Sequence, residues 1–246
     1  MMYTREEFEN LRKQWAHEMA AQEDVQREAL SLFVKADRFN WIHQTSWLGE
    51  PILQLPQDMF ALQEIIYKTK PDFIIEIGVA WGGSLLFYST LMSILGGKKI
   101  IGIDIYIPDD LRQRIYSYKG ISERIVLLNA SSVEPSTIDL VKPILDGSTH
   151  VLVVLDSNHT EDHVLKELHL YSPFVKKGQY LVCSDTIIEK VPVQTHRPRA
   201  WGPGNNPMTA LKKFLQVTNR FEADSEVEEK LLFTCNPSGY LRCIRD

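Results

Sequence analysis

The chain has 246 residues, of which 44% are hydrophobic and 24% charged, and its formal net charge is −5. This composition is typical of a globular protein with a sizeable core, and it excludes a disordered chain. No basic patch stands out and no run reaches the roughly 18 apolar residues of a membrane span, so we expect neither a nucleic acid nor a membrane as partner.

The N-terminal part is predicted to form an arm. Residues 4–36 lack Gly and Pro and carry apolar residues at helical spacing, which predicts one amphipathic helix capped by Thr4. We expect this helix to pack on the body or on a second copy, which would give a homo-oligomer. Residues 40–57 hold two Trp, two Pro and one Gly, a composition typical of a structured loop.

A helix is predicted to follow from Asp58, as its N-cap, to about residue 68. We therefore divide the chain into an arm with its loop, residues 1–57, and a larger domain, residues 58–246.

From residue 72 onward, strands and helices alternate. The predicted strands are residues 72–78, 98–105, 124–130, 150–156 and 178–185, and the predicted helices between them are 84–95, 108–119, 135–145 and 160–175. Apolar strands that alternate with helices of this length predict a parallel sheet covered by helices on both faces.

The C-terminal part has a different pattern. Residues 190–207 form a long loop rich in Pro and Gly, of the kind that often has a function, and a helix is predicted over 208–217. "KLLFTC" (230–235) and "YLRCIR" (240–245) flank "NPSG" and predict a hairpin. The predicted fold is α/β and Rossmann-like, with a mostly parallel seven-stranded sheet and a C-terminal antiparallel hairpin.

The cysteines and the N-terminus indicate the compartment. Three cysteines without a CxxC pair do not suggest a disulfide framework, and "MMYTREEFENLRKQW" lacks the apolar core of a signal peptide. We expect a cytoplasmic protein.

A glycine-rich turn, "IIEIGVAWGGS" (74–84), follows the first strand of the alternating region. Its G-x-x-x-G-G spacing is neither the dinucleotide fingerprint nor a Walker A motif. Asp104 ends the next strand, where a carboxylate can accept hydrogen bonds from both ribose hydroxyls of a nucleoside. The pattern suits S-adenosylmethionine better than NAD, because a methyl donor has no pyrophosphate, although a tight turn beside a solvated Asp is the alternative. Our candidate donor-binding residues are Glu76, Gly78, Gly82, Ser84, Asp104, Ser131, Ser132 and Asp156.

Acidic residues also end the fourth and fifth predicted strands. Asp156 and Asp185 come from neighbouring strand ends, so their carboxylates can converge on Mg²⁺. His159, three residues after Asp156, is close enough to act as a general base. Two alternatives remain open: "HTED" is also a plausible helix start without chemistry, and His159 with His163 has a spacing that can bind zinc.

Several linked motifs together resemble the cephalosporin hydroxylase family, which includes rhamnosyl O-methyltransferases. They are "WLGEPILQLPQDMFALQEII", "EIGVAWGGSLLFY", "GIDI", "LDSNHTEDHVLKEL", "SDT" and "WGPGNNPMTALKKFL", and they run from about residue 41 to the end. The resemblance implies the fold of S-adenosylmethionine-dependent methyltransferases for the larger domain, with the donor bound at Glu76, Gly78, Gly82 and Asp104 and with Ser131 or Ser132 nearby.

The chain also resembles macrolide sugar O-methyltransferases. Those enzymes hold Mg²⁺ with one Asp after strand four and an acidic pair after strand five, and place a catalytic His three residues after the first Asp. Asp156 and His159 match this spacing, whereas the acidic pair falls on Ser184 and Asp185. Ser184 is a neutral ligand, so the resemblance leaves the requirement for a metal open.

We therefore predict an S-adenosylmethionine-dependent O-methyltransferase that acts on a hydroxyl of a sugar or natural product. His159 is the predicted base, and Asp156, Asp185 and Ser184 are the candidate Mg²⁺ ligands. The 190–207 loop is expected to close over the acceptor. Two alternatives stay open: a nucleotide-dependent oxidoreductase or hydroxylase, and a non-catalytic member that only binds the donor. Candidate walls of the acceptor pocket, unless they merely pack in loops, are Trp47, His43 and Trp201.

Overall fold

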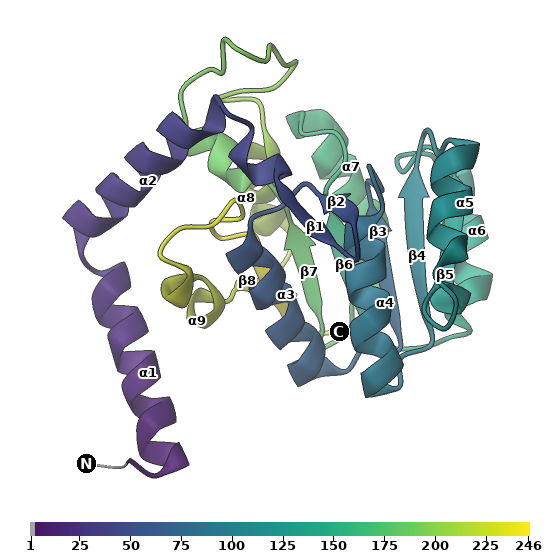
Figure 1. Cartoon of the computed structure of the whole chain (residues 1–246), viewed down its shortest axis with the longest axis horizontal. Coiled ribbons are helices and arrows are strands. Elements are labelled where there is room, and N and C mark those ends of the chain that lie inside the picture. The colour runs from purple at the N-terminus through teal and green to yellow at the C-terminus, as the bar shows by residue number, and fades with distance from the viewer. Residues whose placement is uncertain (1–2) are drawn as a thin grey trace.

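The fold is built around one twisted β-sheet (Figure 1). In the computed structural model, which describes residues 3–246, this sheet has seven strands in the order β5-β4-β3-β6-β7-β9-β8. The strands are β3 (Phe73–Ile77), β4 (Lys99–Asp104), β5 (Ile125–Asn129), β6 (Val151–Leu155), β7 (Tyr180–Cys183), β8 (Phe221–Ala223) and β9 (Tyr240–Cys243). The first five are parallel, and β9 runs antiparallel to both β7 and β8. The predicted fold class is therefore confirmed.

Helices cover both faces of the sheet, as Figure 1 shows. One face packs on α3 (Pro56–Thr69), α4 (Gly83–Leu95) and α5 (Asp109–Ser117), and the other on α6 (Pro135–Leu145), α7 (Glu161–Tyr171) and α8 (Pro207–Val217). Successive strand residues alternate between the two cores, so that Ile74 faces α3 to α5 and Ile75 faces α6 to α8. This double burial explains why the strands are apolar throughout.

Shorter helical segments join these elements. They are α9 (Ser225–Glu228) and the 3₁₀ turns η1 (Trp41–His43), η2 (Ser122–Arg124), η3 (Ser172–Phe174), η4 (Thr186–Lys190) and η5 (Glu229–Leu231).

The N-terminal arm consists of two helices, so the single helix predicted over residues 4–36 is wrong. Helix α1 (Arg5–Ala20) starts with Thr4 in a capping box, and α2 (Glu23–Asp37) begins after a break at Gln22, where φ is −83° and ψ is 96°. The break has a packing reason. Helix α2 packs Phe33 into a core with Leu55 and Ile187, whereas α1, before the break, buries none of its described residues.

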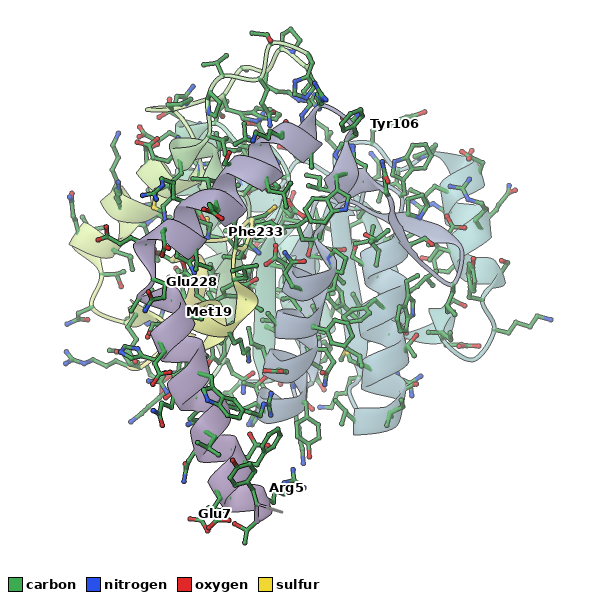
Figure 2. The ribbon with its side chains drawn as sticks, turned by 60° about the vertical axis from the view of Figure 1, so that its left-hand side comes forward. Arg5, Glu7, Met19, Tyr106, Glu228 and Phe233 are labelled. Carbon is green, nitrogen blue, oxygen red and sulfur yellow. The ribbon has the colours of Figure 1, made fainter. Side chains whose placement is uncertain are left out.

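Helix α1 runs along the outside of the molecule. Figure 2 shows Arg5 and Glu7 at its far end, away from the sheet. Exposed ion pairs connect it to the C-terminal region, from Lys13 to Glu226 at 3.4 Å and from His17 to Glu229 at 3.3 Å. Pairing of two copies through this arm, and the domain boundary at residue 57, stay predictions.

Within residues 3–246, no helix is long and apolar enough to cross a membrane.

The predicted loop over residues 40–57 contains a small hairpin, which corrects our expectation of an irregular segment. Strands β1 (Thr45–Trp47) and β2 (Glu50–Ile52) pair antiparallel. Leu48 and Gly49 join them with φ of 52° and 92°, and two positive φ values are what a two-residue hairpin turn of type I′ requires. The hairpin lies directly on the start of α4, because a Cβ at Gly83 would be 2.4 Å from the carbonyl oxygen of Pro51.

Asp58 is a buried anchor, not the N-cap of α3 as the sequence suggested. The helix begins at Pro56, and the Asp58 carboxylate is fully buried in its first turn. It accepts hydrogen bonds from the Thr234 hydroxyl, from the Cys235 backbone N–H at 2.9 Å and from the Tyr240 hydroxyl at 2.9 Å. These bonds tie the C-terminal loop to α3.

The same contacts explain why residues 230–235 are not the predicted strand. They form η5 and a loop whose backbone turns toward Asp58, so the antiparallel partner of β9 at the sheet edge is β8 (Phe221–Ala223). The antiparallel pair exists, but its first strand lies about ten residues earlier than expected.

Asp58→Asn is expected to change how stability depends on pH. Burial raises the pKa of Asp58 from its ordinary 3.8 to about 6. The folded protein therefore binds the proton more tightly than the unfolded chain, and stability falls as pH rises from about 4 to about 6. Relative to Asp58→Asn, the wild-type unfolding free energy should fall by about 2 kcal/mol between pH 4 and pH 7. Urea denaturation of both proteins measures this, and a difference that stays constant with pH would contradict it.

Candidate active site

A cavity of about 550 Å³ lies at the carboxyl ends of the central parallel strands. The strand order reverses between β3 and β6, the position where open α/β sheets bind ligands. The predicted residues that line it are Glu76, Gly78, Ser84, Asp104, Ser131, Ser132, Asp156, His159, Asp185, His43 and Trp201. Three predicted site residues, all within the described part of the chain, do not line the cavity: Gly82, Ser184 and Trp47. The Trp47 ring packs edge-on against Phe87, with ring centroids 5.1 Å apart.

Gly78 brings the ends of β3 and β6 into direct backbone contact. Its φ is +96°, and a Cβ there would be 2.0 Å from the carbonyl oxygen of Asp156. Only glycine fits this place. Gly82 has a different role, because a Cβ there would meet the side chain of Ile115 at 2.6 Å. Gly82 therefore lets α5 pack against the start of α4.

Asp104 organises the two loops that follow β3 and β4. One carboxylate oxygen accepts the Val79 N–H at 2.9 Å, and the other accepts the Tyr106 N–H at 3.0 Å. A carboxylate has about four lone-pair sites, so Asp104 retains capacity for hydroxyl groups of a ligand in the cavity.

Glu76 and Ser84 share a hydrogen bond in the cavity wall. The Ser84 hydroxyl donates to a Glu76 oxygen at 2.9 Å, and Glu76 is only 1% exposed. Burial raises the pKa of Glu76 to about 8. The side chain can thus carry a proton near neutral pH and donate as well as accept.

A buried carboxylate on α7, which the sequence analysis missed, holds another part of the wall. One oxygen of Glu167 accepts hydrogen bonds from Ser132 at 2.5 Å and from Ser157 at 2.6 Å, and it lies 3.0 Å from the His163 ring. The i, i+4 spacing of His163 and Glu167 was the available signal. Glu167 fixes the wall around Ser132.

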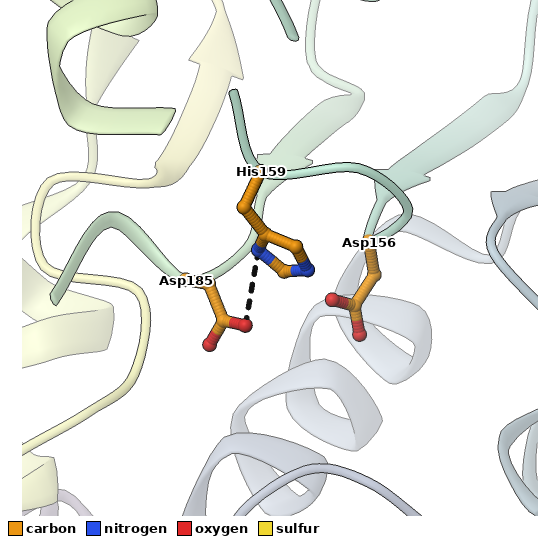
Figure 3. Close-up of side chains that lie close together, drawn as sticks. All are labelled: Asp156, His159 and Asp185. Atoms are coloured by element: carbon orange, nitrogen blue, oxygen red, sulfur yellow. Dashed lines mark ion pairs between the residues drawn. The ribbon is translucent and has the colours of Figure 1, made fainter. Parts of the chain in front are cut away.

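Asp156, His159 and Asp185 converge at the edge of the cavity (Figure 3). Each offers one ligand atom, and these atoms lie within 4.8 Å of one another. His159 Nδ1 is 3.1 Å from an Asp185 oxygen. Asp156 follows β6, His159 precedes α7, and Asp185 follows β7 in the left-handed conformation with φ of 57°. Parallel strands therefore bring together residues 29 positions apart.

Gln54, after the β1–β2 hairpin, completes this arrangement. Its side-chain amide donates to Asp156 at 2.9 Å. Nothing in the local sequence indicated the contact, because the two residues are 102 positions apart.

The two acidic residues carry negative charge that the protein compensates only in part. Burial, with the nearby Asp185 charge, raises the pKa of Asp156 to about 6, and burial raises that of Asp185 to about 7. Burial lowers the pKa of His159, so its ring tends to be neutral. Two close carboxylates of this kind fit a hard divalent cation, which prefers oxygen ligands. The Ser184 hydroxyl is buried and, among residues 3–246, has no hydrogen-bond partner.

The turn around His159 serves as both helix start and cavity wall. Helix α7 begins at Glu161 with Thr160 in the N-cap position, but the Thr160 hydroxyl donates to the Asn158 side chain at 2.8 Å instead of capping the helix. The Glu161 N–H donates to the Asn205 side chain at 2.9 Å. The loop before α8 therefore fastens to this turn.

A family model for rhamnosyl O-methyltransferase/CmcI matches residues 39–244. The chain belongs to the rhamnosyl O-methyltransferase/CmcI family. Rhamnosyl O-methyltransferases of Mycobacterium tuberculosis (strain H37Rv) and Mycobacterium leprae are 27% and 29% identical to it over 207 residues. The alignments cover 80% and 82% of this chain, and 78% and 84% of those proteins.

Solved structures of the rhamnosyl O-methyltransferase/CmcI family share the fold. The "CmcI-N160 apo-structure" has a TM-score of 0.57 at 17% identity, covering 83% of this chain and 78% of that one. The structure called "cmcI-D160 Mg-SAM" has a TM-score of 0.54 at 17% identity, covering 82% and 77%. An S-adenosylmethionine-dependent O-methyltransferase is the enzyme class that this family and this fold support.

Proposed function

We propose that the protein transfers the methyl group of S-adenosylmethionine to a hydroxyl of a small molecule, a sugar or natural product, with His159 as the base. The observation that carries this proposal is that His159, with Asp156 and Asp185, borders the cavity that Asp104 and the Gly78 turn also line. The proposed donor site and the proposed base would thus share one cavity.

The donor half of the cavity rests on Glu76, Gly78 and Asp104. Asp104 would accept ribose hydroxyls, and the turn at Gly78 would let the donor approach the backbone closely. Ser131 and Ser132 line the same cavity and would border the base of the nucleoside. S-adenosylmethionine, when bound, supplies an electrophilic methyl group on sulfur.

The acceptor half is organised by His159. His159 Nδ1 lies 3.1 Å from an Asp185 oxygen, so a proton on Nδ1 would face that carboxylate and leave Nε2 as the basic atom that takes the proton of the acceptor hydroxyl. The new O–CH₃ bond forms as the S–CH₃ bond breaks, and the sulfur keeps the electron pair, which leaves S-adenosylhomocysteine. The lowered pKa of His159 keeps the ring free to accept this proton.

Asp156 and Asp185 would hold a divalent cation. Their ligand atoms lie within 4.8 Å of one another, and burial, the main cause of their raised pKa values, disfavours the charged carboxylates, a cost that a bound cation would offset. Mg²⁺, when bound, would lower the pKa of a hydroxyl ligand and orient it. Gln54 would fix the Asp156 carboxylate through its amide N–H.

We expect metal removal to slow methyl transfer at least about tenfold, because the carboxylates would face each other without a cation. Transfer from labelled S-adenosylmethionine to a panel of glycosides is measured with EDTA and again after adding Mg²⁺. Asp185→Asn should show the same loss, whereas Asp162→Asn, an exposed acid outside the cavity, should not.

Two results would overturn these proposals separately. NADH binding without S-adenosylhomocysteine binding, measured by calorimetry, would exclude methyl transfer and favour an oxidoreductase. Full activity in EDTA would remove the metal and leave methyl transfer in place.

A further inference from the structure

The long loop before α8 is fastened to the arm through a buried carboxylate. Asp37, the last residue of α2, is 4% exposed. It accepts hydrogen bonds from Arg197 at 2.6 Å and from Gln194 at 2.6 Å, and the His196 ring is 3.2 Å away. Three side chains of one loop thus converge on one acid, which holds Arg197 against the cavity wall.

Arg197 keeps donor capacity beyond this ion pair. Its Nη2 is committed to Asp37, its Nη1 lies 3.4 Å from the His43 ring, and its Nε is buried. Within the described chain, this Nε has no hydrogen-bond partner. The Arg197 side chain is 18% exposed and lines the cavity, so a ligand there can contact the exposed part of the side chain.

Arg199 adds a positive charge that the protein does not neutralise locally. It lines the same cavity, and its guanidinium carbon lies 5.4 Å from the centre of the Trp201 ring. No carboxylate among residues 3–246 comes within ion-pairing distance, 4.0 Å, of Arg199.

Trp201 connects this charge to the proposed base. Its ring centroid is 4.9 Å from that of His159, so Trp201 lies close to both Arg199 and His159. His43 lines the same cavity, where burial lowers its pKa and the charges of Arg197 and Arg199 lower it further.

We propose that Arg197 and Arg199 bind an acidic group of the acceptor, a carboxylate or a phosphate, while its hydroxyl faces His159. The planar guanidinium group matches both anions and can bind them with two parallel hydrogen bonds. This inference rests on the proposed function, because it names the class of acceptor that the same cavity takes.

Binding of matched sugars tests the proposal. The probes are 4-nitrophenyl β-D-glucuronide, its neutral glucoside and the glucoside 6-phosphate, titrated by calorimetry with and without S-adenosylhomocysteine in Mg²⁺ buffer. At least one acidic probe should bind tenfold or more tightly than the neutral one. Whichever acidic probe, the glucuronide or the 6-phosphate, binds more tightly shows whether the site prefers a carboxylate or a phosphate.

Arg199→Gln should reduce this preference to less than threefold. The matched control is Arg38→Gln, since Arg38 is also exposed and lies over an aromatic ring, Phe39 at 4.7 Å, but outside the cavity. Arg38→Gln should keep the full preference.

The proposal is overturned if neither acidic probe binds better than the glucoside, or if the preference persists in Arg199→Gln and in the double variant with Arg197→Gln. If S-adenosylhomocysteine binds but the acidic glycosides bind no better than the neutral glucoside, only this inference fails. An acid preference that depends on Arg199, in a protein that does not bind S-adenosylhomocysteine, supports the anion site and overturns methyl transfer.

Discussion

His159→Gln is expected to lower the rate of methyl transfer by a factor of about 10² to 10⁴, the usual contribution of a general base. Gln can still donate a hydrogen bond toward Asp185, but it cannot accept the proton of the acceptor hydroxyl. Binding of S-adenosylhomocysteine should stay within about twofold, because the proposed donor-binding residues of β3 and β4 are unchanged. Single-turnover transfer and calorimetry on the same samples separate the two effects.

The matched control for this variant is His169→Gln. His169 is on α7 as well, but it is exposed and packs against Phe214 outside the cavity. Its rate should equal that of the wild type. If His159→Gln also keeps the wild-type rate, His159 is not the base.

Gly78→Ala is expected to have the second large effect, on both stability and donor binding. The added Cβ would be 2.0 Å from the carbonyl oxygen of Asp156, and two backbone segments cannot separate as a flexible side chain could. The residue also has a φ of +96°, which is unfavourable for alanine. We expect a loss of about 3 kcal/mol or more in unfolding free energy, with donor binding weakened at least tenfold.

Gly96→Ala separates backbone strain from steric overlap. Gly96 ends α4 with a similar φ of +85°, and a Cβ there would meet no atom of the described chain within 4 Å. That variant should lose only about 1 kcal/mol and bind S-adenosylhomocysteine normally. Denaturant titration and calorimetry compare the two variants, and equal losses would mean that contact with Asp156 adds nothing.

Sequence patterns predicted the central fold well where the evidence was local. Apolar runs between turn residues located all five parallel strands, and the spacing from Asp156 to His159 placed both at the end of β6. The positions of Glu76, Gly78 and Asp104 followed in the same way, since the carboxyl ends of parallel strands meet at one edge.

The predictions failed where a distant contact overrides local preference. Asp58 is a residue type favoured at N-caps and stands at the predicted start of the helix. Its carboxylate instead accepts hydrogen bonds from the buried residues Cys235 and Tyr240. Residues 230–235 have the apolar pattern of a strand, yet the same contact holds them in a loop. The arm bends at Gln22 although no Gly or Pro marks the position.

By itself, the sequence determined the strand order along the chain and the residue types that end each strand, because hydrophobic periodicity and turn chemistry act between neighbours. Only the tertiary structure decided which distant side chains complete the site. Gln54 reaches Asp156 across 102 positions, and Asp37 holds Arg197 across 160. Such pairs depend on how packed elements bring side chains together, and no periodic pattern encodes that geometry.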